Sequence, residues 1–316
     1  MPLMLQAALA QYQDALSAAG LQKEHLVCPV FVSERQQAKA RAMPGVPLTH
    51  TGEMVARAQE IADAGISSVI IFGIPKSRDA KGSGAFGRNS VVQNAAREIK
   101  SAFGRSVNII TDVCLCQYNL SGHCGFLSNG RVDNDATVGA LAEIAVSHAD
   151  AGADVVAPSA MMDGQGRAIR EALDAGGFSA RILSYSAKHA SSLYTPFRST
   201  AFQSRGAIDK SSYQVGYANP RQALREMAQD ILEGADMVMV KPALAYLDLV
   251  KRAKEAFQTP VAVQNVSGEY AMIKAAAKRG LVDEEEWKVM SMAAMRRAGA
   301  DRIISYFALD IARYLA

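Results

Sequence analysis

The sequence of 316 residues contains no uninterrupted apolar run of the length that a membrane-spanning helix requires. Residues 1–20 contain no Lys or Arg, which a secretory signal would place ahead of its apolar segment. Only four cysteines are present, and in a chain without an export signal we expect them to stay reduced in the cytoplasm. These absences predict a cytoplasmic protein that does not act in a membrane.

Charge and glycine patterns exclude two further classes of protein. The net charge is only +3 and the basic residues are scattered, so nucleic-acid binding has no electrostatic footprint. No Gly-x-Gly-x-x-Gly motif follows the first strand-like run, which argues against a dinucleotide-binding sheet. With 49% hydrophobic residues, the chain can bury a large core, either as one barrel or as two domains.

A short pattern, with variations on Ala-Gly-Ala-Asp, recurs where an amphipathic helix gives way to a β-rich run. Its glycine favours the left-handed turn that ends a helix, and the residues after it begin a strand. The pattern therefore indicates a repeated helix-to-strand joint. It occurs at residues 64–67, 151–154, 234–236 and 298–301.

Eight strands are expected, and several are nearly continuous in aliphatic residues, as strands covered on both faces should be. Helices alternate with them, for example after the cap Asn219-Pro220 and after Asp283 with Glu286. This alternation predicts an α/β fold, a (β/α)8 TIM barrel over residues 26–316 behind an N-terminal helical arm, residues 1–25. An open doubly wound sheet is the alternative. The expected strands are 26–32, 68–74, 108–115, 154–160, 180–187, 237–243, 260–267 and 302–308.

Three cysteines cluster around the end of the third expected strand. Alternate strand residues share a face, so Asp112, Cys114 and Cys116 should point the same way, and a turn-rich loop can return Cys124 to them. Three thiolates hold a soft metal and leave one position open, as in catalytic zinc sites. Three reduced cysteines that are close by chance are the alternative. His123, beside Cys124, is either a further metal ligand or a neighbouring or surface residue.

Two lysines end neighbouring strands in the expected barrel. Lys241 follows a buried apolar run, and desolvation there should lower its pKa and free the amine to attack a carbonyl. Lys188 ends the adjacent strand, and repulsion between two ammonium groups would depress the pKa of at least one. The pair suggests Schiff-base chemistry on ketones. Alternatively, each lysine extends its charge out of the barrel mouth.

Residues 191–219 show no clear periodicity and contain Arg198, Arg205 and Lys210. Loops of this length within compact domains are often lids. A cationic lid over a lysine-lined pocket would suit carboxylate substrates, whereas the alternative is a solvated charged loop.

Matches along most of the chain carry a family resemblance. The sequence resembles the porphobilinogen synthase family, also called the δ-aminolevulinic acid dehydratase family. The matching segments run in order from Cys28-Pro29-Val30-Phe31-Val32 through Met43-Pro44-Gly45-Val46, Phe72-Gly73-Ile74, Val132-Asp133-Asn134-Asp135-Ala136-Thr137, Ala157-Pro158-Ser159-Ala160 and Ser267-Gly268-Glu269-Tyr270-Ala271-Met272-Ile273 to Ala308-Leu309-Asp310.

The resemblance implies condensation of two 5-aminolevulinate molecules to porphobilinogen, with loss of two waters, in tetrapyrrole (haem) biosynthesis. It implies that Lys241 binds the substrate that supplies the propionate side and Lys188 the one that supplies the acetate side. Arg198 matches an arginine that binds one substrate carboxylate, and Ser267 with Tyr306 match the pair that holds the other.

The resemblance also bears on metals and assembly. The three cysteines are those of the zinc-dependent version, with Asp112 as a plausible proton shuttle or a structural partner for a lysine. Glu226, expected outside the core, matches a magnesium ligand at a subunit contact in some members, and most relatives are homo-octamers. Lys210 stands where an arginine is usual, so Arg205 could replace it, and Ser121 stands where zinc members usually carry a histidine.

Two other functions fit part of these observations. A Schiff-base aldolase on the same barrel would use a strand-end lysine but does not explain three clustered thiols. A non-catalytic zinc-binding or redox-sensing protein would explain the thiols but gives the two lysines no role.

Overall fold

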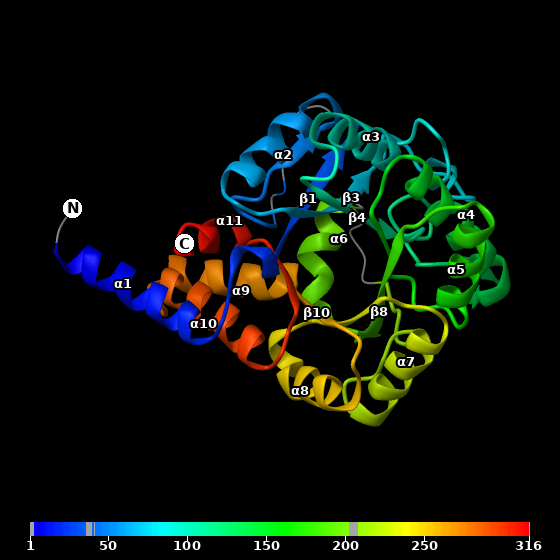
Figure 1. The fold of residues 1–316 in the computed structure, drawn as a ribbon. Helices are drawn as coiled ribbons and strands as arrows, with labels where there is room; N and C mark the ends of the chain where they lie inside the picture. The colour runs from blue at the N-terminus through cyan, green and yellow to red at the C-terminus, as the bar shows by residue number, and fades with distance from the viewer. Residues whose placement is uncertain (1–2, 36–39, 41, 202–207, 316) are drawn as a thin grey trace.

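The computed structural model describes residues 3–35, 40, 42–201 and 208–315, and its strands form a closed parallel barrel (Figure 1). The last strand pairs with the first, with Leu26 opposite Ile303, so the sheet has no open edge here. This closure confirms the (β/α)8 TIM barrel and excludes the open doubly wound sheet. The barrel strands are β1 (Leu26–Ser33), β3 (Ser68–Ile74), β4 (Asn108–Val113), β7 (Val155–Pro158), β8 (Arg181–Lys188), β9 (Met237–Lys241), β10 (Val261–Asn265) and β11 (Arg302–Ser305).

All eight expected strands are present, but several end earlier than the sequence indicates. β4 ends at Val113 rather than at residue 115, and β9 ends at Lys241. Ser267 and Ala308, both included in expected strands, instead begin helices α9 (Ser267–Lys278) and α11 (Ala308–Ala312). The apolar run continues past the last ladder hydrogen bond in each case because the residues beyond it remain buried, so hydrophobicity alone does not mark the end of a strand.

Helices surround the barrel, and their caps follow the sequence. Asn219 Oδ1 accepts the backbone N–H of Gln222, and Asp283 Oδ1 accepts that of Glu286, as expected for N-caps.

Short strands outside the barrel and the outer helices complete the fold. Strand β2 (Leu48–His50) pairs with β1, and β5 (Phe126–Ser128) forms a hairpin with β6 (Arg131–Asp133). The outer helices are α2 (Met54–Asp63), α3 (Val91–Phe103), α4 (Asn134–Asp150), α5 (Gln165–Ala175), α7 (Pro220–Leu232), α8 (Leu247–Ala256), α9 and α10 (Glu284–Arg297).

The repeated joint clamps neighbouring strands together at the amino end of the barrel. Asp154, Asp236 and Asp301 each precede a strand, and each accepts the backbone N–H of the first or second residue of the neighbouring strand before it. Each aspartate N–H also donates back to that residue's carbonyl. The partners are Ile109 at 2.9 Å, Ile182 at 2.8 Å and Val261 at 2.8 Å from the respective carboxylates.

Two of these joints are also covered by a lysine from an earlier helix, Lys100 of α3 and Lys254 of α8. The glycines adopt positive φ, 100° at Gly152 and 111° at Gly299, which ends each helix as expected. The stem of Lys254 lies against Gly299 so closely that a Cβ there would be 2.7 Å from it. The Lys254 ammonium then reaches Asp301 at 2.8 Å, and Lys100 pairs with Asp154 in the same way.

The N-terminal helix α1 (Leu3–Ala18) lies against α10 and extends beyond the barrel (Figure 1). Leu16 is fully buried, and the ring of Tyr12 meets that of Tyr314 edge-on at 5.6 Å. Its second half is therefore docked on the barrel. The division into an arm, residues 1–25, and a catalytic barrel stays a prediction.

Helix α6 (Thr195–Ala201) crosses the carboxyl ends of the strands, inside the ring of outer helices (Figure 1). The segment expected to be aperiodic thus contains a helix, preceded by the 3-10 turn η4 (Ser192–Tyr194). Phe197 anchors it, with ring centroids 5.5 Å from Phe31 and 5.2 Å from Phe72. Because tertiary packing and not periodicity stabilises this short helix, the sequence pattern did not reveal it.

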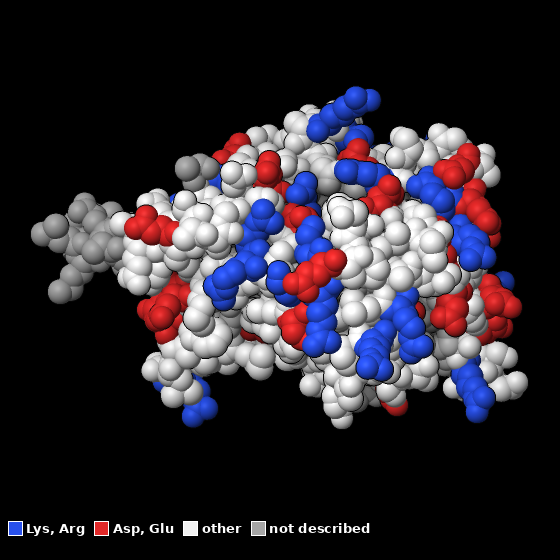
Figure 2. All heavy atoms as spheres, turned by 60° about the horizontal axis from the view of Figure 1, so that its bottom comes forward, with Lys and Arg blue, Asp and Glu red and all other residues white. Residues whose placement is uncertain are grey.

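The surface agrees with the scattered charge of the sequence. On the face shown in Figure 2, basic and acidic side chains lie interspersed. Within the described part of the chain, no helix combines the length and apolar character needed to cross a bilayer.

Candidate active site

Two lysines come together at the ends of β8 and β9 because β8 contains a bulge. Ser184 lies opposite Val238, but Ala187 lies opposite Val240. Over this stretch β8 therefore contains one residue more than β9. The shift places Lys188 directly opposite Lys241. Bulges commonly re-aim a side chain next to an active site, and here the bulge aligns two amines.

Lys241 lies in an apolar and aromatic environment. It is 7% exposed, and its Nζ lies 4.9 Å from the ring centre of Tyr185, 5.3 Å from Tyr194 and 5.9 Å from Phe197. Burial, followed by the charge of Lys188, lowers the pKa of Lys241 to about 7. A large fraction of this amine is therefore neutral near neutral pH and able to attack a carbonyl.

Lys188 is equally buried but has a polar partner. Its ammonium donates to the backbone carbonyl of Ser159, just after β7, and lies 5.6 Å from the Tyr185 ring centre. Tyr194 links the two lysine strands, because its hydroxyl lies 2.7 Å from the carbonyl oxygen of His189 and 3.2 Å from that of Lys241.

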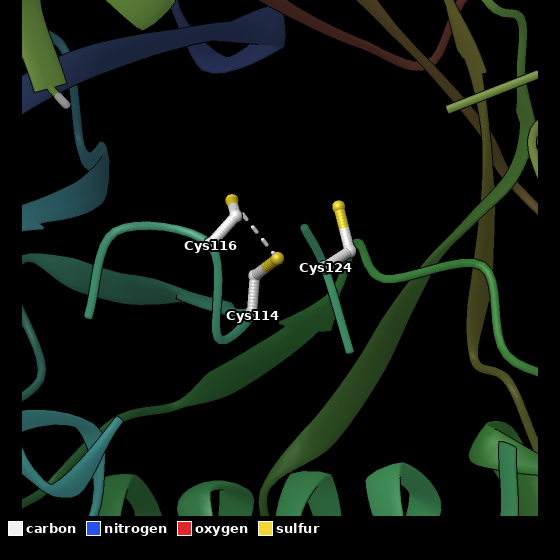
Figure 3. A group of neighbouring side chains, drawn as sticks. All are labelled: Cys114, Cys116 and Cys124. Atoms are coloured by element: carbon white, nitrogen blue, oxygen red, sulfur yellow. Dashed lines mark hydrogen bonds between the residues drawn. The ribbon is translucent and has the colours of Figure 1, made fainter. Parts of the chain in front are cut away.

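Cys114, Cys116 and Cys124 form a compact buried cluster, and their sulfur atoms point to the same side of the chain in Figure 3. Every pair of sulfurs lies within 4.8 Å, and those of Cys114 and Cys116 are 3.2 Å apart. The described residues contain no other group of three or more candidate ligands at this spacing. The cluster predicted from the sequence therefore exists.

The route by which Cys116 reaches the cluster differs from the expected one. Because β4 ends at Val113, strand alternation does not place Cys116; a turn does, in which the N–H groups of Tyr118 and Asn119 both donate to Leu115 O. Asp112 is on the strand as expected and is buried, and its carboxylate accepts the side-chain amide of Gln117 at 2.7 Å.

The donor set suits a soft divalent metal such as zinc. Three thiols converge, and hydrogen bonds from Cys114 and Cys116, together with nearby lysine charges, hold the pKa of Cys124 well below its usual value. His123 does not join the cluster; its Nδ1 lies 3.1 Å from the hydroxyl of Tyr213. Three protein donors leave room for a further ligand, which is the arrangement of a catalytic site.

The three cations expected in the lid have different positions in the structure. Arg198, on α6, borders the lysine pocket, with its guanidinium carbon 5.8 Å from the Tyr194 ring centre and Nη1 donating to Ile208 O at 3.4 Å. Lys210 is buried, borders the same pocket and places Nζ 3.1 Å from Cys124 Sγ. Arg205 lies outside the described residues.

Ser267 and Tyr306 face the same pocket from the ends of β10 and β11. The Ser267 hydroxyl donates to Leu193 O and accepts the N–H of Phe197, so it also secures the segment that carries α6. A Cβ on Gly268 would lie 2.5 Å from the Leu193 backbone, which explains why glycine is present there. The Tyr306 hydroxyl is buried and has no hydrogen-bond partner.

The pocket is small and includes residues that the sequence analysis missed. Its cavity volume is about 40 Å³. Tyr194, Gln214 and Gln264 also line it, and the side-chain carbonyl oxygens of both glutamines are buried and unpaired. Gln264 lies near the end of an expected strand, but nothing in the sequence distinguishes it from other polar residues at strand ends.

Glu226 is further from this chemistry. It is half-buried on α7 and borders a separate open hollow with Asp163 and Asp230. Burial and then the charge of Asp163 raise its pKa. It is not in a group of three converging ligands among the residues described.

Comparisons with known proteins agree with the geometry. The family model "Delta-aminolevulinic acid dehydratase" matches residues 6–314. The chain is 47% identical over 304 residues to the delta-aminolevulinic acid dehydratase of Archaeoglobus fulgidus, covering 94% of this chain and 92% of that one. It is 49% identical over 279 residues to the enzyme of the same name from Synechocystis, covering 87% and 85%.

A solved structure is also similar over most of its length. It is the delta-aminolevulinic acid dehydratase (porphobilinogen synthase) of Toxoplasma gondii, in complex with the reaction product porphobilinogen. The match has a TM-score of 0.90 and 36% identity and covers 93% of this chain and 85% of that one. The fold, the family match and the identities to relatives lead to one conclusion: this chain belongs to the delta-aminolevulinic acid dehydratase family.

Proposed function

We propose that this chain condenses two molecules of 5-aminolevulinate to one porphobilinogen with release of two waters. The observation that carries the proposal is the alignment of Lys241 and Lys188 across β8 and β9, in one pocket with Cys116. Two amines allow both ketones to be held as imines, which converts a reaction between two free molecules into one between neighbouring bound groups.

Each substrate would be held at two points. The neutral amine of Lys241 attacks the ketone of the propionate-side molecule, and water leaves as the imine forms. Its carboxylate lies against Ser267 and the unpaired hydroxyl of Tyr306. Lys188 forms the second imine, on the acetate-side molecule.

The carboxylate of the acetate-side molecule would meet the cations of the lid. Arg198 borders the pocket from α6, Lys210 borders it beside the cysteines, and Arg205 is a further candidate. Asp112 is close enough to influence the pKa of Lys241 electrostatically and is the proposed proton shuttle.

Zinc would be held by the thiolates of Cys114, Cys116 and Cys124. When bound, the ion supplies Lewis acidity that polarises a substrate oxygen and lowers the pKa of a bound water. The protein's own part is to keep three donors buried and converging, with Lys210 beside them.

Regulation and assembly are a separate part of the proposal. We propose a cytoplasmic homo-octamer, with Glu226 as a magnesium ligand that favours this assembly and so raises activity. The half-buried carboxylate beside Asp163 and Asp230 supports a cation at this position. Sedimentation and activity with and without magnesium test it, and an equal response in wild type and Glu226→Ala would make Glu226 a surface residue only.

One assay tests the central proposal. The purified protein is incubated with 5-aminolevulinate alone, and porphobilinogen is measured by its colour reaction. Product formation is expected; a Schiff-base aldolase or a non-catalytic zinc protein would form none. Absence of product from a zinc-loaded, folded sample would refute the proposed function.

A further inference from the structure

Glu269 is a buried carboxylate that the reaction as described does not use. It lies on the first turn of α9, is 2% exposed and is absent from the pocket lining. Its two oxygens face different segments of the chain. Oε1 accepts the N–H of Leu244 at 2.7 Å, and Oε2 accepts the N–H of Val266 at 2.6 Å and the side-chain amide of Asn265 at 3.3 Å.

These bonds join the carboxyl ends of two neighbouring strands. Leu244 follows β9 three residues after Lys241, whereas Asn265 ends β10 and Val266 lies between it and Ser267. A backbone N–H in a buried segment requires an acceptor, so Glu269 fixes both turns in relation to each other. It does so with one rigid carboxylate instead of a chain of flexible contacts.

Asn265 extends the connection to the third strand end. Its Oδ1 accepts the hydroxyl of Ser305 at 3.0 Å, and the Ser305 oxygen in turn accepts the N–H of Phe307 at 3.1 Å. Tyr306 lies between these two residues. The network therefore runs from the turn after Lys241, through Asn265, two residues before Ser267, to both neighbours of Tyr306.

We propose that Glu269 is a positioning residue that sets the separation between the imine-forming amine of Lys241 and the carboxylate-binding pair Ser267 and Tyr306. The inference rests on the proposed function, because it concerns how one substrate is gripped at both ends. Binding of a ketone that carries a carboxylate should depend on this separation, and binding of a ketone without one should not. Glu269 thus favours substrates whose ketone-to-carboxylate distance matches the separation, although it contacts no substrate atom.

An isosteric change isolates the effect. In Glu269→Gln, one of the two oxygens becomes an NH₂ group, which faces a backbone N–H and cannot accept it. One turn is then released, while shape and volume stay the same. Burial raises the pKa of Glu269 to about 7, so the comparison is made at pH 8.5, where the wild-type carboxyl is ionised.

The test uses two ketones that differ by a single carboxylate, 4-oxopentanoate and butan-2-one, trapped with borohydride and located at Lys241 by peptide mass mapping. For Glu269→Gln, we expect the concentration of 4-oxopentanoate that gives half-maximal trapping to rise about tenfold, in line with one lost buried hydrogen bond. The value for butan-2-one should change less than about twofold. Circular dichroism confirms that the variant is folded.

Glu284→Gln is the matched control. Glu284 lies in a different ion-pair cluster, 2.7 Å from Lys274 and 2.8 Å from Lys288, away from the pocket. The Glu284→Gln change should lower stability without changing the ratio between the half-maximal trapping concentrations of the two ketones. If Glu269→Gln does not fold, Ser305→Ala breaks the same network at its far end and should show the same preference.

The outcomes separate the inference from the proposed function. Equal shifts for both ketones, or no shift, in the folded variant would overturn the positioning role. If the wild type forms no adduct at Lys241 with either ketone, the proposed function fails instead.

Discussion

The two ends of this barrel use polar groups in opposite ways. At the amino end, Asp154, Asp236 and Asp301 repeat one arrangement, in which a carboxylate accepts a strand N–H and the aspartate N–H donates back. At the carboxyl end, Tyr306 and Gln264 keep buried polar atoms without partners. The three aspartates are satisfied internally, whereas the polar atoms of Tyr306 and Gln264 leave hydrogen-bonding capacity for a ligand.

Lysines show the same contrast. Lys254 at the amino end is paired with Asp301 at 2.8 Å and remains partly exposed. Lys241 at the carboxyl end is buried beside aromatic rings and a second lysine, and its pKa falls to about 7. The comparison teaches that burial beside a second ammonium group, and not residue type, distinguishes the lysine with a lowered pKa from the one held in an ion pair.

The most severe test exchanges one lysine at each end. Lys241→Met should abolish both activity and borohydride trapping of 5-aminolevulinate, because no other amine replaces the imine. Lys254→Met should keep normal kinetics and only lower the melting temperature. Peptide mass mapping that finds the adduct solely at another lysine would show that the assignment of Lys241 is wrong.

A second test removes one thiol from the cluster. Cys116→Ala should lose tightly bound zinc, measured by metal analysis at about one ion per site in the wild type, and should lose activity by about a hundredfold or more. Cys28→Ala is the control, since Cys28 is buried on β1 and outside the cluster. Activity that survives both this change and complete chelation would rule out a catalytic metal.

The lid cations should have a smaller effect. Lys210→Met or Arg205→Met should lower kcat/KM by about 10- to 150-fold, the equivalent of about 1.5–3 kcal/mol for a lost charge-assisted contact. The larger loss identifies the cation that meets the substrate carboxylate. Unchanged kinetics in both single variants and in the double variant would mean that the segment is not a cationic lid.

The lowered pKa of Lys241 predicts that trapping at this residue falls on the acidic side of the pH profile; this decline is the acidic limb. Below about pH 7 the amine gains a proton and cannot attack, so trapping at Lys241 should fall about tenfold per pH unit. Lys188→Met removes a like charge, raises the pKa of Lys241 and should move the limb to higher pH. A limb that stays in place would show that the two amines do not interact.

The smallest kinetic effect is expected at the amino end. Asp301→Ala leaves the Val261 N–H and Lys254 without their partner, which should reduce the free energy of unfolding by about 1–3 kcal/mol. Steady-state kinetics below the melting temperature should not change. Glu255→Ala, which breaks an exposed pair with Lys251, is the control and should cost about 0.5 kcal/mol or less. A kinetic defect in Asp301→Ala would contradict the distinction between a structural amino end and a ligand-binding carboxyl end of the barrel.

Much of this architecture could be predicted because it repeats. The glycine joints and aliphatic runs predicted eight strands and a barrel, and the barrel brings Lys188, Lys241 and the cysteines to one end. These signals are local and periodic, which is what sequence patterns report. The strand ends were less accurate, since residues such as Cys114 and Val266 remain buried after their strands stop.

Other parts of the site depend on long-range packing. Helix α6 is held by Phe197 against two distant rings, and Tyr306 is recognisable as an unpaired group only when its surroundings are known. Arg198 was noticed as a cation of the aperiodic segment, but its carboxylate-binding role and the choice of Ser267 came from family resemblance. Glu269 had no distinguishing signal in the sequence, because its partner Leu244 is 25 positions away.

The bulge in β8 has a consequence for how such a site could arise. A regular strand would continue the pairing of Ser184 with Val238 by setting Ala187, and not Lys188, across from Lys241. In that register Lys188 would lie one position beyond Lys241, and the two amines would not face each other across the ladder. The bulge absorbs the one extra residue of β8, so the pairing of the two lysines depends on a local irregularity that leaves the rest of the strand in register.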